Sequence, residues 1–76
     1  MDTDRSKWTD EEIRAVEGAE QFSTELDNTG LVSEFTQAII MWTHHRKNGN
    51  RVSRDLWVKV ADVYEREVLL RMNEDD

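Results

Sequence analysis

Two short sequences rich in asparagine and glycine divide the chain into three segments, and this division limits the possible folds more than any other feature. They are Asp27-Asn28-Thr29-Gly30 and Asn48-Gly49-Asn50. Asparagine and glycine tolerate positive φ, so both sequences suit the ends of helices. The chain has no proline, and apolar residues recur every three or four positions within each segment, as on one face of an α-helix. We therefore expect an all-α protein, a compact three-helix bundle.

The three segments also indicate where each helix begins and ends. Thr9 and Glu12 form a capping-box pattern at the start of the first helix, which we place at about residues 10–26. The second helix spans about residues 31–47 with Thr29 or Ser33 as its N-cap, and the third spans about residues 54–72 after Ser53. We expect residues 9–72 to form a single domain, residues 1–8 a flexible N-terminus and residues 73–76 an acidic tail.

The apolar stripes predict which side chains form the core. The expected core residues are Ile13, Val16, Phe22, Leu26, Phe35, Ile39, Trp42, Leu56, Val60, Val63 and Tyr64. Gly18 interrupts the first helix at a cost of roughly 1 kcal/mol relative to alanine. It is either a tolerated defect or a point of close contact with another helix.

Charge is distributed unevenly along the chain, whose formal net charge is −7. Residues 8–43 contain eight acidic residues and one basic residue, Arg14, whereas residues 44–59 contain five basic residues and one acidic residue, Asp55. Closely spaced carboxylates beside an apolar stripe can occupy a basic groove that otherwise binds phosphates. The first candidate surface is thus an acidic face that binds a protein partner with a basic surface; its residues are Asp10, Glu17, Glu20, Glu25 and Glu34.

The basic turn at residues 46–54 supports an alternative function. In helix-turn-helix proteins the N-terminus of the second helix of the motif contacts DNA. The candidate nucleic-acid contacts are Arg46, Lys47, Arg51, Arg54 and Lys59. The acidic charge of the rest of the chain makes nucleic acid the less favoured partner.

The third segment carries more apolar residues than one narrow helix face needs. Two stripes run side by side along it. Such a helix is either the central helix of a monomer or part of an interface with a second copy, since small domains often gain stability by association. For a homodimer formed through this helix, the candidate contact residues are Trp57, Tyr64, Val68, Leu69 and Met72.

Several classes of function are disfavoured by the residues present. The chain has no cysteine, and the adjacent residues His44 and His45 point about 100° apart on a helix, so they do not chelate one ion. No glycine-rich phosphate loop or catalytic triad motif is recognisable. We expect no catalytic activity, no cofactor, no metal ion and no membrane partner. A cytoplasmic location follows from the lack of an apolar leader at residues 1–5.

The resulting hypothesis is a small acidic interaction module that binds and modulates a larger protein. Inhibition of an enzyme or factor that handles nucleic acid is the form we favour, because such a target offers a basic groove. Small size and acidity also fit a regulator encoded by a phage or plasmid.

Overall fold

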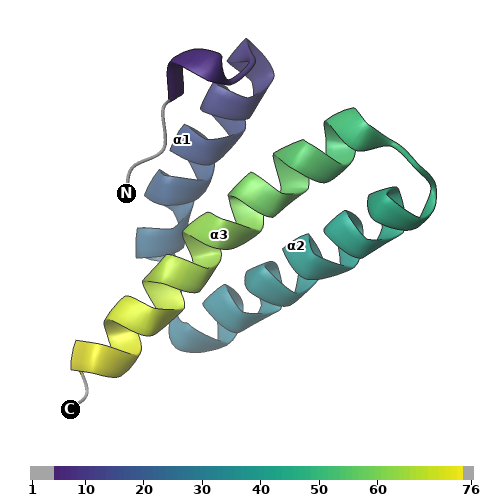
Figure 1. The fold of residues 1–76 in the computed structure, drawn as a ribbon. Helices are drawn as coiled ribbons and strands as arrows, with labels where there is room; N and C mark the ends of the chain where they lie inside the picture. The colour runs from purple at the N-terminus through teal and green to yellow at the C-terminus, as the bar shows by residue number, and fades with distance from the viewer. Residues whose placement is uncertain (1–4, 75–76) are drawn as a thin grey trace.

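The computed structural model of this chain describes residues 5–74 and consists of helices joined by short connections (Figure 1). A single 3-10 turn, η1 (Arg5–Lys7), precedes three α-helices. These are α1 (Asp10–Glu25), α2 (Asn28–Lys47) and α3 (Arg51–Glu74). No strand occurs among residues 5–74. The prediction of an all-α three-helix bundle is confirmed.

The third helix is the centre of the fold. α2 and α3 lie antiparallel and side by side, joined by a turn of three residues, and α1 packs on the other flank of α3 (Figure 1). The close contacts between helices are those of α3 with its two neighbours. Because α1 and α2 meet α3 rather than each other, a groove is left between them above α3.

Two of the predicted helix starts are too late, and capping explains why. The Asp27 carboxylate accepts a hydrogen bond from the Gly30 N–H at 2.7 Å, so Asp27 is the N-cap of α2 in place of Thr29 or Ser33. At the next turn, Asn50 Oδ1 accepts from the Ser53 N–H at 3.2 Å. Ser53 therefore lies inside α3, and α3 begins at Arg51.

Helical structure extends to both ends of the described residues. The capping box is confirmed: the Thr9 hydroxyl accepts from the Glu12 N–H and the Glu12 carboxylate accepts from the Thr9 N–H. Trp8, assigned from sequence to a flexible N-terminus, packs against the core. At the other end, α3 continues through Asn73 and Glu74. Residues 1–4, 75 and 76 of the predicted flexible ends lie outside the described residues.

The core contains more alanine than predicted. Its buried apolar residues are Val16, Ala19, Leu31, Ala38, Val60, Ala61, Val63 and Tyr64. Among the other predicted core residues, Ile13, Leu26, Phe35, Trp42 and Leu56 are partly buried. Each helix buries one alanine, and these small side chains let α1 and α2 lie close to α3. Larger apolar residues next to these contacts are therefore left at the surface.

Phe22 and Ile39 are two such residues, and their predicted place in the core is wrong. Phe22 is 45% exposed and Ile39 is 38% exposed. On α1 the adjacent residue Ser23 faces α3 instead, 2% exposed, with its hydroxyl bonded to the Glu20 carbonyl. Gly18 has no neighbouring atom within 4 Å of the position its Cβ would take. It is therefore a tolerated defect and not a close contact between helices.

Candidate protein-binding groove

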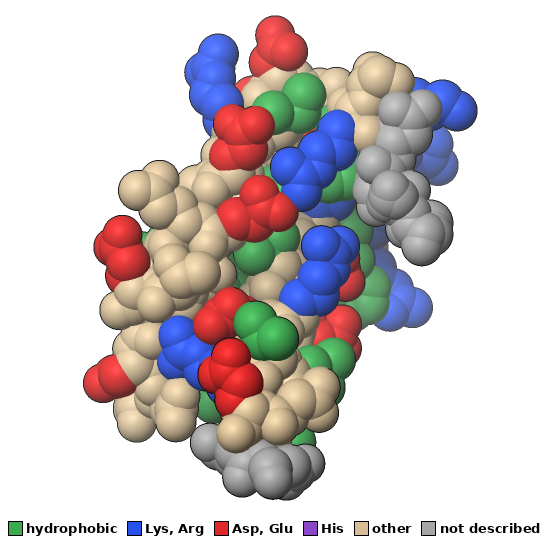
Figure 2. All heavy atoms as spheres, turned by 90° about the vertical axis from the view of Figure 1, so that its left-hand side faces the viewer, with side chains coloured by type: hydrophobic (Ala, Val, Ile, Leu, Met, Phe, Trp, Pro, Cys, Tyr) green, Lys and Arg blue, Asp and Glu red, His purple; other side chains and the backbone are tan. Residues whose placement is uncertain are grey.

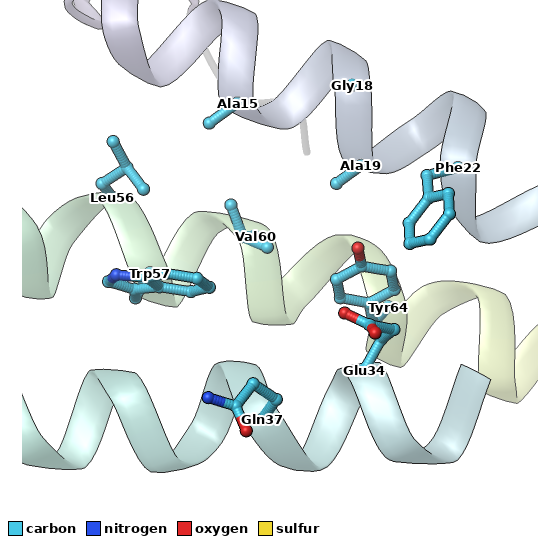
Figure 3. A pocket seen from close by; sticks show the side chains of 10 residues that line it. All are labelled: Ala15, Gly18, Ala19, Phe22, Glu34, Gln37, Leu56, Trp57, Val60 and Tyr64. Carbon is cyan, nitrogen blue, oxygen red and sulfur yellow. The ribbon is translucent and has the colours of Figure 1, made fainter. Parts of the chain in front are cut away.

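The groove between α1 and α2 is a hollow with a volume of about 480 Å³. Its floor is the face of α3 that carries Leu56, Trp57, Val60 and Tyr64. One wall belongs to α1 and the other to α2, as Figure 3 shows. The residues that line these walls are Ala15, Gly18, Ala19, Phe22, Glu34 and Gln37.

The groove is apolar except for one carboxylate and one amide. Glu34 is its only charged lining residue, and it makes no ion pair within residues 5–74. Tyr64 and Phe22 present aromatic surface near the Glu34 side chain, and Trp57 lies farther along the groove floor (Figure 3). A carboxylate next to aromatic rings attracts a cation that also carries apolar surface, because the ring faces are themselves partly negative. The groove thus favours a basic and partly apolar ligand.

The pKa of Tyr64 reflects the negative charge in the groove. Burial raises the pKa of its hydroxyl above the ordinary value of 10.0, and the nearby Glu34 carboxylate raises it further. Both effects favour the neutral phenol in the folded state. Tyr64 therefore adds stability that is fully present below pH 10.0 and is lost as the pH rises through the folded-state pKa.

This electrostatic contact can be measured directly, because Tyr64 is the only tyrosine in the chain. In an ultraviolet absorbance titration of the phenol, we expect Glu34→Gln to lower the pKa of Tyr64 without returning it to the ordinary value. Glu17→Gln, on the outer face of α1, is the matched control and should leave the pKa of Tyr64 in place. Equal effects of the two substitutions would contradict the described position of Glu34.

The predicted acidic face is not one continuous surface. Asp10, Glu17 and Glu25 are exposed on α1. Glu20 pairs with Arg5 at 2.7 Å, and Glu34 lies on α2 in the groove. Figure 2, which shows the left-hand side of Figure 1, has acidic and basic side chains interspersed. Of the five predicted acidic residues, Glu34 alone combines an unpaired charge with an apolar surround.

Glu12, a member of the capping box, is largely buried in the fold. Its side chain, 11% exposed, pairs with Lys59 across the contact between α1 and α3 at 3.3 Å. The Lys59 ammonium also lies 5.4 Å from the centre of the Trp8 ring. This pair ties α1 to α3, so Lys59 is a structural residue here and not an available nucleic-acid contact.

The basic turn is partly neutralised within the molecule. Arg54 pairs with Asp55 at 3.2 Å, while Arg46, Lys47 and Arg51 make no ion pair within residues 5–74. The turn itself is only three residues long, shorter than expected. However, α2 and α3 lie antiparallel along their whole length (Figure 1), whereas the helices of a helix-turn-helix motif cross at about 90–120°. The start of α3 is therefore not presented as a recognition helix.

The residues predicted for self-association lie at three different places on α3. Trp57 and Tyr64 line the groove, and Tyr64 is only 6% exposed. Val68 and Met72 line a separate hollow between α2 and α3. Leu69 is 53% exposed. The five residues do not share one surface, since α3 presents different sides to α1, to α2 and to solvent.

Sequence reasoning missed most of the groove. Ala15 and Gln37 gave no signal of their own, because the lining of a groove formed by three helices depends on how each helix is rotated about its axis. Among residues 5–74, no group of three or more histidine, aspartate or glutamate side chains is placed to hold a metal ion. None of the helices in this part of the chain has the length and apolar character needed to cross a membrane. Comparison with protein-family models, curated proteins and solved structures finds no match for this chain.

Proposed function

We propose that this protein is a cytoplasmic, non-catalytic interaction module that binds a larger protein through the groove between α1 and α2, and thereby modulates it. The observation that carries the proposal is the Glu34 carboxylate, which makes no ion pair within residues 5–74 and lies beside Tyr64 in a groove lined mainly by apolar side chains. Buried aromatic residues with a charged group at their edge are typical of the energetic centre of protein interfaces.

The dimensions of the groove suit an amphipathic helix of the partner. A volume of about 480 Å³ accommodates a few large apolar side chains, as in complexes where a helix lays residues i, i+3 or i+4, and i+7 into a groove. The net charge of −7 and the position of Glu34 favour lysine or arginine beside those apolar residues. The expected ligand is therefore a basic amphipathic helix on the partner.

Proteins that handle nucleic acid carry such basic segments, and this agrees with the target class expected from the sequence. Occupying the basic segment would compete with its binding of phosphates, so the expected consequence is inhibition. Binding of DNA by this protein itself has no comparable support, because the antiparallel α2–α3 hairpin does not present a recognition helix. Self-association uses a different face, on the side of that hairpin turned away from α1.

The test compares three variants of the tagged protein in affinity capture from lysate of the cells that encode it, after nuclease treatment. Glu34→Lys reverses the charge of the groove. Gly18→Gln places a side chain over the groove at a position with no neighbour within 4 Å, and it leaves the net charge unchanged. Glu17→Lys changes the net charge as Glu34→Lys does, but on the outer face of α1.

The expected result is a captured protein that both groove variants lose and Glu17→Lys retains, as quantified by mass spectrometry. Glu34→Lys, which changes charge, and Gly18→Gln, which adds bulk, would then identify the same binding site. The captured protein can be purified and assayed for inhibition. If Glu17→Lys abolishes capture while Glu34→Lys and Gly18→Gln do not, the outer face of α1 is the contact surface and the groove proposal is wrong.

A further inference from the structure

A second apolar surface runs along the α2–α3 hairpin, on the side turned away from α1. It includes two hollows of about 240 Å³ and 250 Å³ that α1 does not line; Asp62 and Glu65 also line the first, and Arg71 also lines the second. The Asp62 carboxylate pairs with Arg66 on the same helix. Four large apolar side chains are exposed along it: Val32 at 55%, Ile39 at 38%, Val58 at 41% and Met72 at 59%. Phe35 and Trp42 lie partly buried between them. We call this surface the hairpin face.

The two ends of the hairpin face carry opposite charges. Arg46, Lys47 and Arg51 are exposed where α2 ends and α3 begins. Asp27 and Glu74 are exposed at the other end, where α2 begins and α3 ends. The 20 residues of α2 separate the ends by about 30 Å, at 1.5 Å per residue. At physiological salt this distance exceeds the screening length of about 8 Å, so the two ends act as separate charges.

This polarity makes the hairpin face complementary to a second copy of itself. When two copies face each other antiparallel, related by a two-fold axis across the helices, α2 lies over α2 and α3 over α3. Arg46 and Lys47 of one copy then approach Asp27 of the other, and Arg51 approaches Glu74. The symmetry repeats each contact at both ends. The parallel arrangement places like charges together and is disfavoured.

From the exposed apolar side chains of the hairpin face and the opposite charges of its two ends, we propose that this face is the interface of an antiparallel homodimer. The proposal is independent of the groove. Because α1 packs on the opposite flank of α3, dimerisation leaves both grooves uncovered, and a dimer presents two of them to partners.

The test is sedimentation equilibrium of the purified full chain over a range of concentrations. The expected result is a reversible rise in mass from 9.0 kDa to twice that value. Val32→Lys should weaken the dimer at least about tenfold, because a charge enters its apolar seam. Ile40→Lys is the matched control: Ile40 lies on the same helix, is 54% exposed and lines neither hollow, so this substitution should change dimerisation little.

A charge exchange tests the antiparallel arrangement itself. Arg51→Glu and Glu74→Arg should each weaken the dimer, and the double substitution should restore it, since the exchanged charges again face each other. A chain that stays monomeric up to millimolar concentration overturns the proposal. So does equal weakening by Val32→Lys and Ile40→Lys. Weakening by the double substitution as strong as by both single ones overturns the antiparallel arrangement.

Discussion

Replacing Leu31 by alanine is expected to lower the free energy of unfolding by about 3 kcal/mol, within the usual range for truncation of a fully buried leucine. Leu31 is 2% exposed and is one of the two largest fully buried side chains of the described residues. A domain of this size has a total stability of only about 4–11 kcal/mol. The substitution therefore removes a large part of what holds α2 against α3.

Ile40→Ala is the control for this prediction. It removes a similar volume from the same helix, but Ile40 is 54% exposed, so its cost should stay within about 0.5 kcal/mol. Urea unfolding followed by circular dichroism gives both values. Similar losses of stability for Leu31→Ala and Ile40→Ala would mean that α2 is rotated differently about its axis from the described position.

The rotation of α2 about its own axis could not be predicted from the sequence. The three helices, their approximate extents and the capping box at Thr9 were predicted correctly, because each depends on residues close together in the chain. Ile39 was expected in the core and is 38% exposed, whereas Leu31, which was not among the expected core residues, is 2% exposed. On a helix rich in apolar residues several stripes fit the same pattern, and only packing against a neighbour selects one.

The position of Phe22 at the candidate site was likewise not predictable from the sequence. Its place every three to four residues along an apolar stripe suggested the core, whereas Ser23 and Ala19 face α3 and Phe22 lines the groove. The groove joins side chains from all three helices, so its composition depends on the rotation of each one. Glu34 was singled out from the charge pattern as a candidate residue, but the apolar side chains around it were not predictable from that pattern.

Neutralising Arg71 should cause the second large loss of stability, because this side chain joins all three helices. Its guanidinium donates to the Leu26 carbonyl at 2.6 Å and the Ser23 carbonyl at 3.0 Å, both at the end of α1. It also donates to the Asn28 side chain at 3.0 Å, at the start of α2. It also forms a salt bridge with the Glu67 carboxylate on α3 at 2.9 Å. No basic residue lies in the last turn of α1 itself, so Arg71 supplies donors for carbonyls that a helix end otherwise leaves unpaired.

We expect Arg71→Ala to lower the free energy of unfolding by about 2–3 kcal/mol, because it leaves two carbonyls and the largely buried Glu67 carboxylate without partners. Arg71→Lys keeps the charge but loses the planar fork, so it should recover only part of this loss. The control is Arg66→Ala, which removes the exposed pair with Asp62 on the same helix at the same i, i+4 spacing. Its expected cost is about 0.3–0.5 kcal/mol.

The segments that lose protection from hydrogen exchange show whether Arg71 holds the α1–α2 connection against α3 or contributes to stability in general. Hydrogen exchange of Arg71→Ala should be accelerated first in the last turn of α1 and the first turn of α2, where the lost partners lie. Amides in the middle of α3 should exchange at rates set by global unfolding. Uniform acceleration along all three helices, or a cost no larger than that of Arg66→Ala, would show that Arg71 does not hold the α1–α2 connection against α3.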